Sequence, residues 1–237
     1  MSDDRPQPIL EHLGELRWRI VRSGIAVVAA SLFALLFADR IKAVLERPYV
    51  AACARCELQV FGATEQFSTL MKLAFFGGII LASPVILYQT WAFINPALTS
   101  RERKWALPII GACVVLFGVG IVFGYWVMPR GLEFLLNIFP DVRTDLRLVE
   151  YFSFAIRFLL AFGLSFLYPV FLFAAAAAGL VTAEQLARGR RYAVLIIVIA
   201  AALITPTGDA LTLALLSIPL YLFYEITYWL VRLLLRR

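Results

Sequence analysis

The chain has 237 residues, of which 62% are hydrophobic and 16% are charged, with a mean hydropathy of +0.85 and a formal net charge of +6. This composition leaves too little polar surface to cover a soluble globule, so it indicates an integral membrane protein. The positive charge does not indicate a nucleic-acid partner, because the basic residues are spread over several loops and do not form a basic soluble face.

The first expected element is an amphipathic helix within residues 1–19. Apolar residues such as Ile9 and Leu13 recur at helical spacing, while Glu15 lies on another face. Such a helix lies at the membrane interface and leads into the first span, which gives Glu15 a fixed depth at that surface. A less favoured alternative is a signal peptide, because the basic stretch 17–22 is followed by an apolar run.

Six apolar runs follow, and each predicts a membrane-spanning helix. They cover residues 20–38, 67–94, 106–128, 152–178, 192–204 and 210–235. The fifth run is short, and the sixth is short too if its end lies at the interface. Bends are predicted at four prolines inside the runs, Pro84, Pro108, Pro169 and Pro219. The predicted fold is therefore all-α, a single domain (1–237) of six spans that form a concave bundle.

Basic residues predict the orientation. Six spans place both termini on one side, where the loops and termini carry 13 arginine and lysine residues, against seven on the other side. The seven are also offset by acidic residues in the same loops. Because basic residues accumulate in cytoplasmic connections, both termini are expected in the cytoplasm.

The first outer loop contains a C-x-x-C pair, Cys53 and Cys56. An oxidising compartment allows a local disulfide between them, although two free thiols remain an equal alternative. Redox catalysis is not expected, because no thioredoxin-like βαβ pattern surrounds the pair. Two thiols alone also make an incomplete zinc site, so no metal or other cofactor is expected.

The end of the second span is the most informative part of the chain. Asn95 and Pro96 disfavour further helix, and the rings of Tyr88 and Trp91 are of the kind that gather at a bilayer surface. Glu102 then lies just outside the membrane, as one acid among three bases. A carboxylate held there is suited to receive a cationic ligand.

Several motifs, in order along the chain, resemble those of the TatC family, a subunit of the twin-arginine protein translocase. They are HLGELRWR at 12–19, SPVILYQ at 83–89, WAFINPAL at 91–98, RER at 101–103, AFGLSF at 161–166, TP at 205–206, IP at 218–219 and FYE at 223–225. The resemblance covers nearly the whole chain.

The resemblance implies a receptor and core subunit, not an enzyme. Such a protein binds the twin-arginine signal peptide of folded cargo proteins and assembles with small single-span partners of the TatA and TatB type and with further copies of itself. Export would be driven by the proton-motive force. The expected location is the cytoplasmic (inner) membrane of a bacterium or archaeon, as a multi-pass protein in contact with the lipid bilayer.

Two arginines in a ligand need two acids, because a guanidinium presents a planar fork of donors that a carboxylate binds bidentately. Glu15 and Glu102 are the two candidates, and the resemblance carries the signal-peptide role to them. It also implies that Arg17, Arg19 and Arg103 orient the acids and that Phe93 and Leu98 line the apolar part of the site. The alternative is that both acids only pair with neighbouring arginines on a solvated face.

The resemblance adds four further candidates, Pro48, Gln89, Asp209 and Glu225. Pro48 is assigned to the shape of the first outer loop. Asp209 is either an outer acid or a cap of the sixth helix, and Glu225 is either a polar group of the bundle or a residue that reaches water.

Leu167 departs from the family pattern, because members commonly carry a glutamate at this position in the fourth span. An ionisable residue at bilayer depth is costly and is usually kept for function. We expect Glu225 or Tyr168 to supply polarity instead, and Leu167→Glu to leave transport unchanged or improved.

The main alternative function is a secondary transporter for a small solute. Such transporters usually show inverted repeats and polar groups near the midplane, whereas Lys72 and Arg157 lie toward the outer ends of the second and fourth spans. A membrane hydrolase is a weaker alternative, because His12 is the only histidine and no nucleophile elbow is present.

Overall fold

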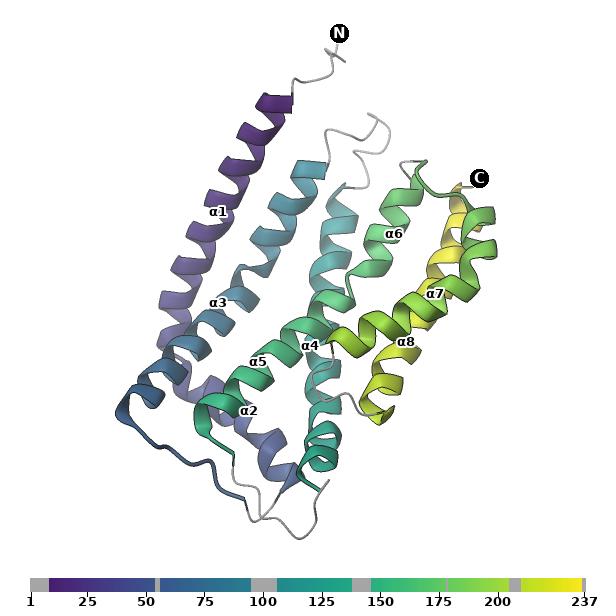
Figure 1. The fold of residues 1–237 in the computed structure, drawn as a ribbon. Helices are drawn as coiled ribbons and strands as arrows, with labels where there is room; N and C mark the ends of the chain where they lie inside the picture. The colour runs from purple at the N-terminus through teal and green to yellow at the C-terminus, as the bar shows by residue number, and fades with distance from the viewer. Residues whose placement is uncertain are drawn as a thin grey trace.

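The computed structural model describes residues 9–53, 56–94, 106–137, 146–177, 179–204 and 210–235. Its elements are α1 (Ile9–Leu35), α2 (Ala38–Ala52), α3 (Ala63–Ile94), α4 (Ala106–Leu136), α5 (Leu148–Ser165), α6 (Tyr168–Ala177), α7 (Ala183–Ile204), α8 (Ala210–Leu230) and a π-helix, Val231–Leu235 (Figure 1). Apart from a β-bridge between Gln59 and Arg147, the regular structure of these residues is helical. The prediction of an all-α fold is confirmed.

Five stretches of the described residues are long and apolar enough to cross a membrane: Gly14–Leu35, Ala63–Phe93, Pro108–Leu136, Leu148–Ala177 and Thr212–Leu233. They correspond to five of the six predicted spans, so the chain is a polytopic membrane protein. The remaining predicted span, 192–204, forms the second part of α7. Thirteen residues give about 20 Å of helix, which is less than the hydrocarbon core of about 30 Å.

Helix α1 is one uninterrupted helix, so the expected division into an interfacial helix (1–19) and a separate span does not appear in the described part. It runs beside α3 in the opposite direction (Figure 1). Glycines bring the two backbones together: a Cβ on Gly78 would lie 2.7 Å from the Ser31 Cα, and one on Gly77 would lie 2.9 Å from the Ala34 Cβ. Small residues permit such close helix approach in membranes.

Helix α2 replaces part of the predicted outer loop. Pro48 lies inside this helix and is buried, so its assignment to loop shape is wrong. A proline in a helix leaves the carbonyl four residues earlier without its usual donor. Here that carbonyl belongs to Val44, and the Tyr125 hydroxyl of α4 donates to it at 2.8 Å. Pro48 thus leaves a carbonyl of α2 available for a hydrogen bond from α4, which helps these two helices to pack together.

Pro84 and Pro108, two of the prolines at which bends were predicted, occupy different positions in their helices. Pro84 lies inside α3, and the Ser83 hydroxyl donates to the freed carbonyl of Ile80 at 2.7 Å. Pro108 lies in the first turn of α4 as the structure describes it, a position where a proline is tolerated. Pro129, which was not among the predicted bends, lies inside α4.

The fourth predicted span is broken into α5 and α6 at Phe166 and Leu167, and the chain changes direction there (Figure 1). Pro169, the second residue of α6, cannot donate to the carbonyl of Ser165 and so ends the α5 ladder. The break is anchored by a fully buried aromatic core in which the rings of Phe158 and Phe162 lie 4.6 Å apart.

Candidate functional site

The most prominent predicted site residue is Glu15, which the fold places opposite the end of α3. Arg19, one turn later on α1, donates to the Glu15 Oε1 atom from Nε at 3.1 Å and from Nη2 at 2.5 Å. The Nη1 atom of Arg19 also donates to the side-chain oxygen of Gln89 on α3, at 3.2 Å. Three predicted candidates therefore form one contact that joins α1 to α3.

The surroundings of this contact are half-exposed. The side chain of Glu15 is 29% exposed and that of Arg19 is 19% exposed. Charge-assisted hydrogen bonds of this kind are stronger than neutral ones, and Arg19 is held from two sides. The arrangement therefore presents a carboxylate whose present partner is a guanidinium, at the surface of the protein.

Other predicted site residues lie near this contact or outside the described residues. Phe93 is half-buried in the last turn of α3, and the side chain of Arg17 is exposed on α1. Leu98, Glu102 and Arg103 lie outside the described residues. Helix α3 ends, and α4 begins, at the end of the molecule where α1 begins (Figure 1).

Glu225 lies in a second polar contact, between α7 and α8. The Arg190 Nη2 atom donates to its Oε2 atom at 2.8 Å, and the Tyr221 hydroxyl donates to Oε1 at 3.0 Å. The Arg190 guanidinium also lies over the ring of Tyr228, 4.6 Å from the centroid. The acid therefore has a cationic partner on the neighbouring helix. Sequence reasoning missed Arg190, although a carboxylate within an apolar helix signals that a partner is needed.

Leu167 does not share this polar surrounding. Its side chain is 3% exposed and packs in an apolar cluster with Leu87, Cys113 and Phe117. The neighbouring Tyr168 turns toward α8, where its hydroxyl donates to the Leu220 carbonyl. The described surroundings of Leu167 are thus a packed hydrophobic contact, and the free Cys113 is one of its members.

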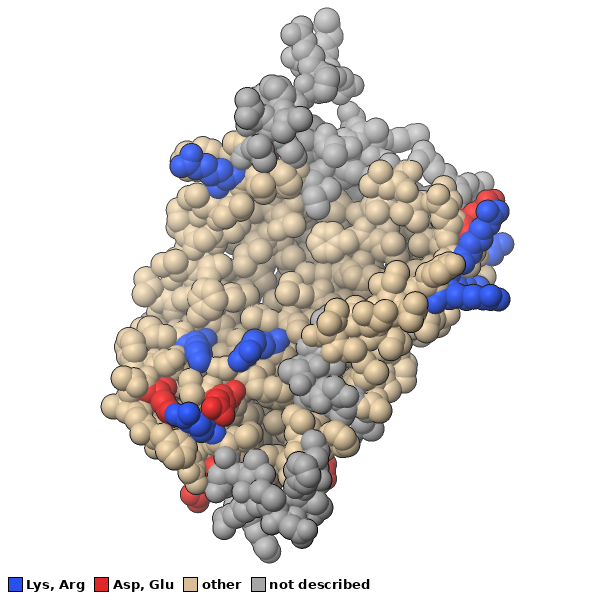
Figure 2. Space-filling model, viewed as in Figure 1, with Lys and Arg blue, Asp and Glu red and all other residues tan. Residues whose placement is uncertain are grey.

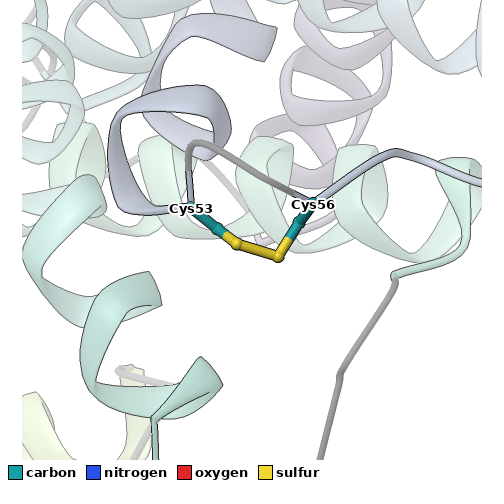
Figure 3. The surroundings of a disulfide bond; sticks show 2 residues. All are labelled: Cys53 and Cys56. Atoms are coloured by element: carbon teal, nitrogen blue, oxygen red, sulfur yellow. A yellow bond between two sulfur atoms is a disulfide. The ribbon is translucent and has the colours of Figure 1, made fainter.

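On the opposite end of the molecule, Cys53 and Cys56 are joined in a disulfide (Figure 3). The bond closes the chain directly after α2, with the two Cα atoms 5.5 Å apart. Asp209 lies outside the described residues. Among the residues that the structure describes, no group of three histidine, cysteine or acidic side chains could hold a metal ion.

Comparisons with known proteins converge on one family. The family model for the Sec-independent protein translocase protein (TatC) matches residues 11–219. The TatC protein of Desulforapulum autotrophicum is 40% identical over 228 residues, covering 95% of this chain and 84% of that protein. The TatC protein of Aquifex aeolicus is 38% identical and covers 97% of each chain. The chloroplastic TATC protein of Arabidopsis thaliana is 37% identical, covering 98% of this chain and 68% of that protein.

Solved structures agree with the sequence relatives. A crystal structure of the twin arginine translocase receptor TatC in DDM superposes with a TM-score of 0.80, at 38% identity, covering 94% of this chain and all of that one. A second crystal structure of the same receptor superposes with a TM-score of 0.75. The fold and the order of motifs therefore match together.

Proposed function

The chain belongs to the TatC family and is a receptor and core subunit of the twin-arginine translocase, and from that premise we propose that Glu15 and Glu102 bind the two arginines of a signal peptide. This membership replaces the solute-carrier alternative, and it makes the protein a transport subunit and not an enzyme. The observation that carries the proposal is the contact of Glu15 with a guanidinium, that of Arg19.

The Glu15–Arg19 contact suggests how a signal peptide gains access. Arg19 occupies the carboxylate in the absence of a ligand, and Gln89 holds the same guanidinium from α3. An incoming arginine can replace Arg19 on Glu15 while Arg19 keeps its bond to Gln89. The exchange costs little because one charged contact replaces another of the same kind.

Glu102 would supply the second carboxylate, with Arg17 and Arg103 keeping the acids in place and Phe93 and Leu98 contacting the apolar part of the peptide. Gln89 acts here through Arg19. Glu225, Asp209 and Pro48 would serve the assembled translocase, and of these the ion pair of Glu225 with Arg190 fixes α7 against α8.

The proposed topology has six spans, with the apolar part of α7 (192–204) as a short fifth, Thr212–Leu233 as the sixth, and one concave domain formed by residues 1–237. Both termini lie in the cytoplasm, and the protein resides in the inner membrane of a bacterium or archaeon. The direction change between α5 and α6 supports the concave shape. TatA- and TatB-type single-span subunits and further copies of the chain would assemble on it, and the proton-motive force would drive export of the folded cargo.

Signal-peptide binding by the purified protein tests the two acids. We expect an Arg-Arg peptide to bind more tightly than its Lys-Lys counterpart, because an ammonium lacks the fork that two carboxylate oxygens accept. Glu15→Gln and Glu102→Gln should each weaken Arg-Arg binding by about tenfold to 100-fold, the equivalent of one charged hydrogen-bonding contact.

Glu184→Gln is the matched control, because this exposed acid lies in the first turn of α7 and also pairs with an arginine four residues later, Arg188. It should leave binding unchanged. Equal binding of the two peptides by well-folded protein, or full binding by both glutamine variants, would contradict the assignment.

A further inference from the structure

Two basic side chains, Lys72 and Arg157, lie on neighbouring helices, α3 and α5. Lys72 is the only basic residue of α3, and Arg157 is the only basic residue of α5. Figure 2 shows two separate basic patches over these two helices, side by side in that view, with a mixed acidic and basic group nearer the outer end. The two helices pack against each other.

Ser153 accepts a hydrogen bond from the side chain of Lys72 and another from that of Arg157. Lys72 donates from Nζ to the Ser153 hydroxyl oxygen at 2.7 Å, and Arg157 donates from Nε to the Ser153 carbonyl oxygen at 3.0 Å. The serine hydroxyl itself donates to the Val149 carbonyl at 2.5 Å, which turns its lone pairs toward Lys72. These bonds use one donor of each cation, so two donors of the lysine and four of the arginine remain.

The described residues supply no acid to either cation. Neither Lys72 nor Arg157 has an ion pair within 4.0 Å there, whereas the acids at the outer ends of the same helices, Glu65 and Glu150, both pair with Arg147. Uncompensated charges at a membrane face are costly and mark functional sites with a counter-charge elsewhere.

The depth of the two cations points to the chemistry of that counter-charge. From residue 73 to the end of α3 the helix has 22 uncharged residues, which correspond to about 33 Å of helix and match the hydrocarbon thickness of about 30 Å. Arg157 bonds to the same serine as Lys72, so the two cations lie at a similar depth. Lys72 and Arg157 therefore both lie at the outer boundary of the hydrocarbon, where phospholipid phosphates begin.

We propose that Lys72 and Arg157, positioned by Ser153, bind the phosphate of an outer-leaflet anionic phospholipid. Two cations disfavour a zwitterionic lipid, because its ammonium group would be repelled while an anionic headgroup would not. The acyl chains would lie toward the cytoplasmic side along exposed apolar side chains, among them Phe75 on α3 and Leu164 on α5. This lipid site is independent of the signal-peptide site, and its assignment to the outer leaflet rests on the proposed orientation.

Native mass spectrometry of the delipidated protein in detergent tests the lipid site. Synthetic phosphatidylglycerol and phosphatidylcholine with identical acyl chains are titrated against the protein. We expect at least tenfold tighter binding of phosphatidylglycerol, and loss of this preference in the double variant Lys72→Gln/Arg157→Gln. Ser153→Ala keeps both charges but removes the hydroxyl that orients Lys72, and should weaken phosphatidylglycerol binding by several-fold.

Arg130→Gln is the control, because Arg130 is another outer-side cation but its guanidinium lies over the Trp126 ring, 4.3 Å from the centroid. It should keep the phosphatidylglycerol preference, and thermal unfolding in detergent should show that all variants fold. Equal affinity for the two lipids, or an unchanged preference in the double variant, would overturn the proposal and leave an acidic side chain of another polypeptide as the counter-charge.

Discussion

Two helix pairs hold this molecule together in different ways. Helices α1 and α3 meet through small residues, and a Cβ on Gly78 would collide with the Ser31 backbone. Helices α7 and α8 meet through long polar side chains, with Arg190 bound to Glu225 and the Tyr224 hydroxyl donating to the Leu186 carbonyl at 2.6 Å. The first contact depends on shape and the second on charge and hydrogen bonds.

The difference matters for what each pair can do. Close backbone packing has no alternative arrangement of similar energy, because interiors are dense and tolerate little added volume. This suits the pair that carries Glu15, since a receptor carboxylate must keep its position. Long side chains can exchange partners, so the α7–α8 pair is the place where the molecule can adjust its packing most readily.

A carboxylate at Leu167 gives the largest expected effect, because Leu167 has none of the partners that Glu225 has. Leu167→Glu places an acid in the cluster of Leu87, Cys113 and Phe117, and should destabilise the protein by about 3 kcal/mol, the cost of an acid in an apolar membrane setting. Such a loss would count against the expectation, drawn from the sequence, that this variant leaves transport unchanged or improved. Thermal unfolding in detergent measures it, with Leu167→Met as the control; unchanged stability of the glutamate variant would show that the cluster admits water.

Gly78→Ala tests the α1–α3 pair. The added methyl group would lie 2.7 Å from the Cα and N atoms of Ser31, so the helices must separate, at a cost of about 2 kcal/mol. The matched control is Gly111→Ala on α4, where a Cβ would meet nothing within 4 Å. The two variants should differ clearly in midpoint temperature. A Gly78 variant as stable as the Gly111 variant would mean that the α1–α3 contact is as adjustable as the α7–α8 contact.

Arg190→Met tests the α7–α8 pair and should cost about 1–2 kcal/mol, because it leaves Glu225 without its cation. The expected loss of stability is modest because the side chains of Arg190 and Glu225 are 41% and 25% exposed, so solvent screens their attraction. The double variant Arg190→Met/Glu225→Leu should recover most of the loss, as judged by a double-mutant cycle of unfolding temperatures. Additive losses would indicate that the two side chains act separately.

Tyr224→Phe is the mildest change. It removes the hydroxyl that donates to the Leu186 carbonyl but keeps the buried ring, so we expect a loss of about 1 kcal/mol. Hydrogen exchange should speed up in α7 while α1 and α3 keep their protection. Uniformly faster exchange in all helices would contradict the view that the two pairs respond separately.

The long apolar runs made most of the helices predictable. Helix α2 was not, because it is short and amphipathic and lacks the length signal of a span. The break at Phe166 and Leu167 could be predicted from Pro169. The position of Pro108 in the first turn of a helix could not be predicted in this way, because it depended on where α4 begins. The presence of most helices could thus be predicted from local sequence, whereas the positions of their ends depended on tertiary contacts.

In the candidate site, too, some contacts could be predicted from local sequence and others could not. The Glu15–Arg19 pair follows from residues four apart on one helix, a spacing that sequence shows directly. The bond from Arg19 to Gln89, the pairing of Arg190 with Glu225 and the bond from Lys72 to Ser153 join distant segments. Partners of this kind are set by helix packing, which no local pattern records.

The Cys53–Cys56 disulfide has a consequence for the way this protein can be followed during its biogenesis. A bond between thiols persists only in an oxidising compartment, and on the proposed orientation these two residues reach one only after the segment that follows α1 has crossed the membrane. The oxidation state of the two cysteines therefore reports whether this segment has crossed the membrane. If both thiols of a newly made chain still react with an alkylating reagent, the segment that follows α1 has not yet crossed the membrane. If the thiols are protected from the reagent, that segment has crossed.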